Sequence, residues 1–245
     1  MLALPKLSIV LIVSDRHHRV PAVIDEASRA LPHAETLDIV IIDDATETAN
    51  GQRLHALAAA DPRVRLYRQP TPIGDDAALR QAVALVNGEW VARLDAYGRD
   101  DPHDLPDMLC EARQYGLTLV QGVPLDPRCR WRASLLRVAR RFGLESRRSG
   151  TYGMRLIRRD VLATLPAVNR VQHFLPMLIR RTGGRVGTLY VNRRPSRQAP
   201  RPALRQLPLQ LLRDTLDGLG MWWLTKRWHA DKPSLKRRQR GYVRG

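Results

Sequence analysis

The stretch GEWVARLDAY, residues 88–97, decides the fold. A Gly-Glu turn leads into a short apolar strand, and the strand ends at a carboxylate, Asp95. Residues 39–44, IVIIDD, show the same arrangement upstream, with Asp43 and Asp44 at the strand's end. Acidic residues at the carboxyl ends of strands in an open α/β sheet face the ligand crevice. We therefore expect these three carboxylates to lie in one binding site.

Short apolar stretches alternate with helical patterns through most of the chain. Strands are expected at residues 7–13, 38–42, 64–67, 90–94, 117–120 and 186–191. Apolar residues at helical spacing predict helices at residues 20–31, 52–60, 75–86, 105–115, 161–165 and 174–181. This alternation predicts an α/β fold with a mostly parallel sheet, right-handed crossovers and helices on its faces.

The chain is strongly basic and its charge is unevenly distributed. Its 245 residues include 41 Lys and Arg against 24 Asp and Glu, a net charge of +17, and nearly all the cations are arginines. Arginine binds phosphate bidentately, so phosphate-bearing partners are favoured, although a biased codon usage would enrich arginine equally well. Most acids precede residue 127. We expect the first half to handle a ligand and the second half to face an anionic surface.

Two amphipathic helical patterns, at residues 130–142 and 204–228, place tryptophan beside arginine or lysine. This composition is typical of helices that lie on a membrane surface, and the alternative is packing against the sheet. The expected organisation is a catalytic-type domain over residues 1–200, an interfacial helical region over 201–231 and a basic, disordered tail over 232–245.

The remaining features narrow the location and the partners. No apolar run is long enough to cross a bilayer and no leader-peptide pattern begins the chain, so a cytoplasmic protein at the inner membrane face is expected. Two cysteines without metal-binding spacing fit a reducing compartment. No nucleic-acid-binding motif accompanies the arginines, so nucleic acid is not an expected partner, and a salt-sensitive nucleic-acid module is the least favoured alternative.

The order of motifs in the first half resembles the family-2 glycosyltransferases, which have the GT-A fold. Members of this family typically read Asp-Asp-Gly-Ser after the second strand, where this chain has Asp43-Asp44-Ala45-Thr46. They typically read Asp-Ala-Asp after the fourth strand, where this chain has Asp95-Ala96-Tyr97. The matching pieces also include residues 7–13, residues 63–68 with Gly74 shortly after, and Pro102.

The second half resembles one branch of that family, the polyprenyl-phosphate glycosyltransferases similar to dolichol-phosphate-mannose synthase. Residues 153–162, GMRLIRRDVL, are similar to the Gly-Phe-Arg segment of that branch. Residues 173–176, HFLP, and 191–195, VNRRP, are similar to its Phe-Leu-Pro helix and its Val-x-His-Arg-Pro segment. The resemblance extends over about residues 6–228.

The resemblance implies inverting transfer of a sugar from a nucleotide sugar to a polyprenyl phosphate or another lipid or glycan acceptor. Such an enzyme must neutralise a leaving diphosphate and hold an anionic acceptor close to it. The implied nucleotide-sugar residues are Asp43, Asp44, Gly74 and Asp95, with Asp95 and Arg99 as the catalytic pair at the diphosphate. The implied acceptor-phosphate residues are Arg137, Arg155 and Arg193. An Asp pair that merely caps the following helix is the alternative for Asp43 and Asp44.

Tyr97 leaves open whether this site binds a divalent metal ion. Relatives hold Mg²⁺ or Mn²⁺ with both acids of Asp-x-Asp, and here only Asp95 of that pair is present. Three interpretations remain: Arg99 replaces the metal at the diphosphate, the site has decayed, or a weak metal site uses Asp95 and Asp100. The second interpretation corresponds to an alternative function, a pseudo-glycosyltransferase that binds at membranes without turnover. Sugar, nucleobase and oligomeric state are not determined by these patterns.

Overall fold

The computed structural model describes residues 6–14, 18–31, 37–124, 153–165 and 171–194. The strands are β1 Leu7–Val13, β2 Leu37–Asp43, β3 Val64–Arg68, β4 Trp90–Leu94, β5 Leu119–Pro124, β6 Arg155–Arg158 and β7 Val186–Val191. The helices are α1 Val20–Ala30, α2 Thr48–Ala60, α3 Asp75–Leu85, α4 Leu105–Gln114, α6 Arg159–Ala163 and α7 Val171–Arg181, with a 3₁₀ turn, η2, at Pro102–Asp104.

Several predictions from the sequence concern residues outside these ranges. They are the basic helix at 130–142 with Arg137, the interfacial region at 201–231 and the basic tail at 232–245. These, and the domain boundaries that depend on them, stay predictions. Within the described ranges, no helix combines the length and apolar character needed to cross a bilayer.

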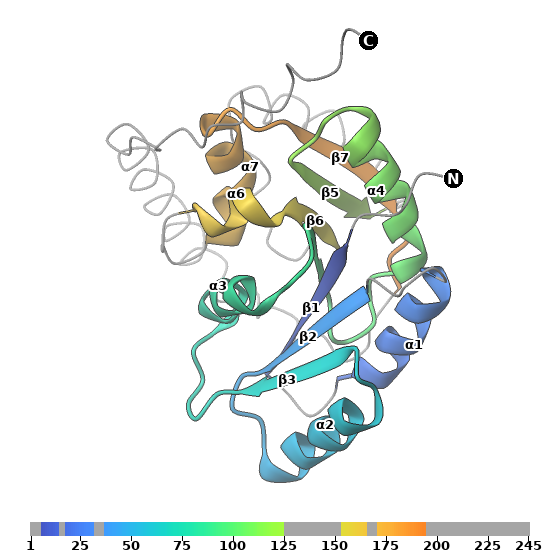
Figure 1. Ribbon diagram of the computed structural model, residues 1–245, viewed down its shortest axis with the longest axis vertical. Coiled ribbons are helices and arrows are strands. Elements are labelled where there is room, and N and C mark those ends of the chain that lie inside the picture. The colour runs from blue at the N-terminus through green and yellow to red at the C-terminus, as the bar shows by residue number, and fades with distance from the viewer. Residues whose placement is uncertain (1–5, 15–17, 32–36, 125–152, 166–170, 195–245) are drawn as a thin grey trace, which may run out of the picture.

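The described strands form one sheet in the order β3-β2-β1-β4-β6-β5-β7 (Figure 1). Strand β1 lies between β2 and β4 and is parallel to both. All seven residues of β1 are buried, which requires that both faces of the sheet be covered. The expected α/β architecture with a mostly parallel sheet is therefore confirmed.

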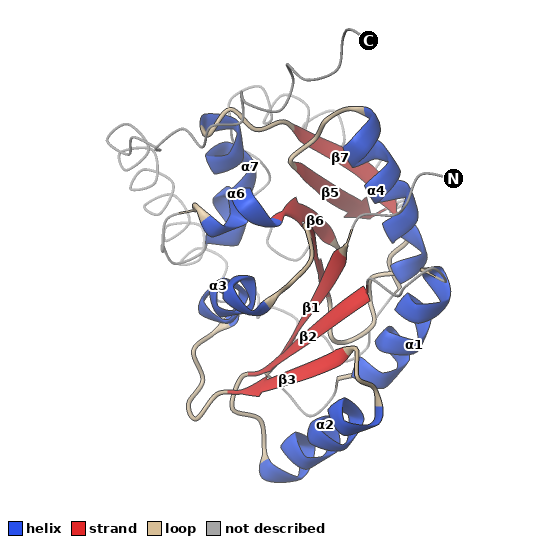
Figure 2. Cartoon of the chain, in the orientation of Figure 1, coloured by secondary structure: helices blue, strands red, loops and turns tan. Residues whose placement is uncertain are grey.

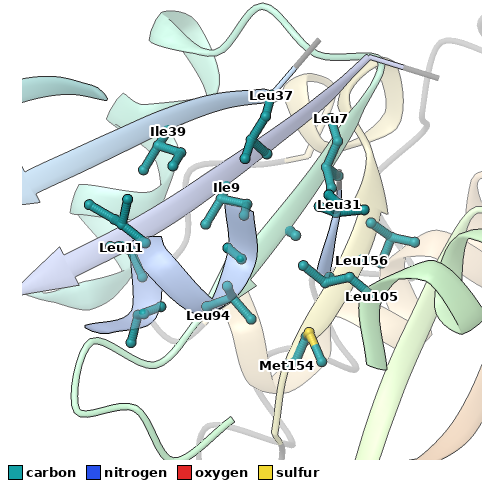
Figure 3. Packing of buried hydrophobic residues seen from close by; sticks show 14 of the residues in the cluster. Leu7, Ile9, Leu11, Leu31, Leu37, Ile39, Leu94, Leu105, Met154 and Leu156 are labelled. Atoms are coloured by element: carbon teal, nitrogen blue, oxygen red, sulfur yellow. The ribbon is translucent and has the colours of Figure 1, made fainter. Parts of the chain in front are cut away.

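Helices cover the two faces as separate layers (Figure 2). One apolar cluster joins alternate residues of β1, β2 and β4 to α1, α2 and α4, and the side chains in its centre are shown in Figure 3. A second cluster joins the other alternate residues to α3, α6 and α7. Leu11 and Val10 illustrate the division, because neighbours along a strand point to opposite faces.

The sequence reading missed β6, an interior strand of the sheet that runs antiparallel to both of its neighbours. It pairs with β4 on one side and with β5 on the other. Only Leu156 and Ile157 separate the arginines at its two ends, so four residues carry no periodicity that identifies a strand. Its position arises from pairing with two long-range neighbours.

Several predicted boundaries differ from those observed, among them the starts of β5 and α2. Strand β5 begins at Leu119 rather than 117, because Gly116 adopts a positive φ of 57° and the Leu117 amide still bonds to Ala112 of α4. Helix α2 begins at Thr48 rather than 52, since Asp43 accepts a hydrogen bond from the Thr46 amide and turns the chain early.

A buried polar network ties the amino ends of the central strands together. The Ser8 hydroxyl, which is fully buried, donates to Asp38 Oδ2 at 2.7 Å and accepts from the Gly88 amide at 2.8 Å. Asp38 also receives a bidentate pair from Arg65 of β3 and a hydrogen bond from the Asn87 amide. The network fixes the turn that leads into β4, and therefore the position of Asp95.

Ser8→Ala is expected to lower the free energy of unfolding by about 1–3 kcal/mol, because it leaves the buried Gly88 amide without an acceptor. Chemical denaturation measures this directly. Thr164→Ala, which removes a hydroxyl bonded to the Val161 carbonyl of its own turn, is the control and should change stability less. Equal effects would show that the network does not contribute beyond an ordinary hydroxyl.

Candidate active site

The carboxyl ends of β1, β2 and β4 meet at one edge of the sheet. The register pairs Val13 with Asp43 and Leu11 with Leu94, so the acids that follow β2 and β4 emerge at the same edge. This edge is where an open α/β sheet binds its ligand. The structure thus brings Asp43, Asp44 and Asp95 to one side of the fold, as the sequence led us to expect.

Asp43 stabilises the turn after β2 through one carboxylate oxygen, and its other oxygen accepts no hydrogen bond from the described residues. Its side chain is fully buried, and Oδ1 accepts a 2.9 Å hydrogen bond from the Thr46 amide. Oδ2 has no hydrogen-bond donor among the described residues and lies 3.6 Å from Nε of Arg68. Asp43 is not the cap of α2, whose first flanking residue is Glu47. A buried carboxylate oxygen beside a cation remains for a ligand donor.

Asp44 fixes the loop that begins α3. Its two oxygens accept hydrogen bonds from the amides of Ile73 and Gly74, at 2.7 and 3.0 Å, and its exposed fraction is 5%. Gly74 has a φ of 80°, a conformation that side chains rarely adopt. Asp44 and Gly74 therefore act as one unit that positions the start of α3, and their contact with a nucleotide stays a prediction.

Asp95 and Arg99 form a bidentate ion pair across one turn. Arg99 donates from Nη2 to Oδ1 at 2.7 Å and from Nε to Oδ2 at 2.8 Å, and its amide also donates to Oδ2 at 3.2 Å. The Tyr97 ring lies against the same guanidinium, 5.6 Å from centroid to Cζ. The hydrogen bonds to Asp95 raise the pKa of Arg99 above its usual value, so this cation is permanently charged.

Asp100 is a buried acid beside Asp95. Its exposed fraction is 4%; Oδ2 accepts the Asp95 amide at 3.0 Å, and Oδ1 is buried without a hydrogen-bond donor among the described residues. Burial raises the pKa of Asp100 and the charge of Asp95 raises it further, against the opposing effect of Arg193. A Cβ at Gly153 would lie 3.2 Å from Oδ1, so the missing side chain there leaves room for this carboxyl.

Arg193 lies near Asp95 and Asp100, although it follows β7 and they follow β4. It forms an isolated antiparallel bridge with Asp100, and the next amide, of Arg194, donates to the Arg99 carbonyl at 2.7 Å. Burial lowers the pKa of the half-buried Arg193 guanidinium, Asp100 raises it, and Arg99 lowers it. The predicted residues Asp95, Arg99 and Arg193 therefore do lie together, with Asp100 completing two acids and two cations.

Hydrogen bonds of the residues on either side of Arg193 hold this segment in place. Arg194 donates to Glu26 of α1 at 2.7 Å and to Asp101 at 3.1 Å. Asn192 donates from its amide to Asp104 at 2.7 Å. The sequence reading assigned no role to Asp101 or Arg68, because their partners lie far away along the chain. It named Arg194 only among the arginines that could converge on an acceptor phosphate, and that role stays a prediction. The only sequence signal was the adjacent arginine pair in VNRRP.

Arg155 lies within the sheet, opposite Arg93 of β4. It is 5% exposed, and its Nη1 donates to the carbonyl of Gln172 in α7 at 2.6 Å. The face of β6 that bears Arg155 is the one covered by α3 and α7. Its predicted contact with an acceptor phosphate stays a prediction, as does that of Arg137, which lies outside the described ranges.

The donor set at Asp95 does not fit a divalent cation. Mg²⁺ and Mn²⁺ require several oxygen ligands around one point, whereas both Asp95 oxygens are engaged by a guanidinium. Tyr97 adds a neutral ring where a second carboxylate would complete the site. In the part of the chain that the structure describes, no three acidic, His or Cys side chains gather in a metal-binding group.

The strand order, with antiparallel β6 between parallel strands and acids at the carboxyl edge, defines the GT-A class of nucleotide-sugar transferase folds. Solved structures of this class are similar to the chain. A glucosyl-3-phosphoglycerate synthase from Mycobacterium tuberculosis, solved with Mn²⁺, UDP and phosphoglyceric acid, is 21% identical with a TM-score of 0.61, covering 85% of this chain and 78% of that one. The mannosyltransferase PcManGT from Pyrobaculum calidifontis, solved with GDP-Man and Mn²⁺, is 19% identical with a TM-score of 0.59, covering 80% and 59%.

The chain belongs to glycosyl transferase family 2, whose family model matches residues 8–165. Among curated proteins, a dolichyl-phosphate beta-glucosyltransferase, ALG5A, from Trichomonas vaginalis is 27% identical over 128 residues. That match covers 50% of this chain and 40% of the relative's length. The resemblance stated from the motifs is thereby confirmed at the level of the family, and the relative lies in the predicted branch.

The raised pKa of Asp100 predicts a pH dependence with a definite sign. Above the ordinary pKa of 3.8 the unfolded chain loses this proton before the folded protein does. The stability that the group contributes is therefore complete below that pH and is lost as the pH rises through the raised pKa. The difference in unfolding free energy, Asp100→Asn minus wild type, should increase with pH over this interval, as measured by urea denaturation.

Asp101→Asn is the matched control: burial tends to raise the pKa of Asp101, but hydrogen bonds from His103 outweigh it and hold that pKa below its usual value of 3.8. Its difference from wild type should decrease as the pH rises from the lowered pKa to 3.8 and should not change through this group above that interval. Slopes of the same sign in the two variants would contradict the assignment for Asp100.

Proposed function

We propose that this protein transfers a sugar from a nucleotide sugar to a polyprenyl phosphate, with inversion, and that two arginines replace the divalent cation. Family membership and the dolichyl-phosphate relative support sugar transfer and this acceptor class. The observation that carries the metal-free form is the group of two acids and two guanidiniums around Asp95. An interfacial location follows from the acceptor, and the tryptophan-rich pattern at 204–228 supports it.

The bonds exchanged are simple. An acceptor phosphate oxygen attacks the anomeric carbon, a new carbon–oxygen bond forms, and the bond from that carbon to the donor diphosphate breaks. The nucleoside diphosphate leaves with the electron pair. Because a phosphate oxygen is already ionised at neutral pH, the reaction needs no strong general base. The catalytic demand falls on electrostatic stabilisation of the leaving group and on alignment of two anions.

Arg99 meets the first demand while Asp95 positions it. A guanidinium has five N–H donors, and the pair with Asp95 uses one edge of the fork. The remaining donors are held in a fixed orientation by Asp95 and the Tyr97 ring. Arg193 adds a second cation that interacts electrostatically with Asp100 and Asp95. Together they supply the two positive charges that a divalent cation provides in the Mn²⁺-bound neighbours.

Asp43 is the proposed contact to the nucleoside. Its buried Oδ2 is oriented by the Thr46 turn and by Arg68, and it can accept from a ring N–H or a ribose hydroxyl. Asp44 acts through the backbone of Ile73 and Gly74, which holds the start of α3 beside that position. The thermal-shift measurement with UDP, GDP and their sugars identifies the base and the sugar of the donor.

The same Asp95–Arg99 pair also favours the alternative, a non-catalytic relative. Both Asp95 oxygens are engaged by the guanidinium of Arg99, and a site that had lost the acid which relatives carry at the position of Tyr97 would have the same geometry. The two functions differ in whether a nucleotide binds without metal and whether sugar is transferred.

A nucleotide that occupies the site should raise the melting temperature in EDTA. A ligand at about 100 times its dissociation constant adds about 2.7 kcal/mol, a readily measured shift. UDP, GDP and their sugars form the panel, each with EDTA, Mg²⁺ or Mn²⁺. Arg99→Met should abolish the shift, whereas Arg63→Met, which removes a surface partner of Asp61, should retain it. A shift that requires metal would overturn the arginine substitution.

Transfer itself separates the two functions. Wild type should move labelled sugar to polyprenyl phosphate in anionic vesicles in the presence of EDTA. Tyr97→Asp should lower this rate at least tenfold, because it adds an anion beside the leaving diphosphate. Inactivity of the wild type combined with metal-dependent transfer by Tyr97→Asp would support the decayed site instead. Equal rates in the two proteins would show that position 97 does not face the reaction.

A further inference from the structure

A row of polar side chains crosses the sheet directly beneath Asp95. Arg93 of β4 pairs with Arg155 of β6, and Arg155 pairs with Gln121 of β5. Residues opposite one another on adjacent strands lie on the same face, here the face covered by α3 and α7. The next row on this face is Val91, Ile157 and Leu119, all buried in the apolar cluster. The polar row therefore lies between the apolar core and the edge that carries Asp95.

This row has more hydrogen-bond donors than acceptors. Nη2 of Arg93 donates to Asp75 at 2.7 Å, yet its buried Nε has no acceptor among the described residues. Gln121 is 2% exposed, and its buried amide nitrogen likewise has no acceptor within the described ranges. Because buried donors without acceptors are costly and rare, their presence at a ligand-binding edge indicates an anion that is supplied from outside.

Asp75, the acid that pairs with Arg93, is open to water, so an anionic ligand can displace it. The side chain of Asp75 is 55% exposed, and that of Arg93 is 25% exposed. An ion pair so open to water contributes little to stability. Asp75 opens the first turn of α3, immediately after Gly74, whose amide is held by Asp44. The guanidinium is thus reachable from the same loop that the proposed nucleotide would contact.

We infer that Arg93 is a phosphoryl-binding residue, with Asp75 occupying its guanidinium in the free protein and exchanging for a phosphoryl oxygen of the substrate. The inference rests on the proposed function and deepens it, because it assigns a third arginine to the substrate. The phosphoryl group belongs either to the donor diphosphate or to the acceptor phosphate, and both present the same tetrahedral anion to a guanidinium.

The test compares three variants by calorimetric titration in EDTA with UDP, GDP, farnesyl phosphate and inorganic diphosphate. Arg93→Met should weaken the phosphoryl ligand that contacts it about tenfold, the loss of one charge-assisted hydrogen bond. Asp75→Asn should tighten the same ligand a few-fold, because it removes the competing carboxylate. Arg63→Met, a matched removal of an ion-paired arginine at the start of β3, should leave all affinities within about twofold.

The probes separate the two phosphate sources. Weakened UDP or GDP binding places Arg93 at the donor, and weakened farnesyl phosphate binding alone places it at the acceptor. Circular dichroism and the melting temperature of Arg93→Met establish that the variant is folded, and Arg93→Lys should recover part of the affinity.

The two proposals fail in different ways. If wild type and Arg93→Met bind the probes equally, or if the wild type binds none of them, the inference is wrong. Arg93-dependent binding of inorganic diphosphate without any nucleotide binding would retain the phosphoryl site and overturn the proposed donor.

Discussion

The parallel pairing of β1 with both β2 and β4 is the constraint on which the rest of the structure depends. A strand buried along its whole length can sit only at the centre of a sheet that is covered on both faces. Its register aligns the ends of its two neighbours, so the acids that follow them are delivered to one edge. At the amino ends of these strands, the Ser8–Asp38 network stabilises the same register.

Electrostatic balance organises that edge. Two carboxylates, Asp95 and Asp100, are confined within one tight turn, and Asp100 is so buried that its pKa rises. Arg99 is supplied by the same turn, whereas Arg193 arrives on a segment after β7 that Arg194 fastens to α1. The site is therefore closed by residues that are about a hundred positions apart in the chain, which makes the turn after β4 and the segment after β7 one structural unit.

The alternation of strands and helices could be predicted from the sequence because parallel strands buried on both faces read as continuous apolar runs. Six of the seven described strands and all six described α-helices were placed within about four residues. Strand β6 could not be placed in this way, since four residues with arginine at each end have no period of their own. The site showed the same division: Asp43, Asp44 and Asp95 follow recognisable strands, whereas Arg68, Arg93 and Arg194 depend on distant partners.

The sequence by itself determined the fold class, the family resemblance, the acids at the strand ends and the replacement of the second metal-site acid by Tyr97. These properties are local, because a strand, its exit and a missing carboxylate are each contained within about ten residues. Only the tertiary structure decided that both oxygens of Asp95 are held by Arg99, that Arg193 joins Asp100, and that Arg93 lies beneath them. Those facts depend on register and burial, and both are set by contacts between segments that the linear sequence keeps far apart.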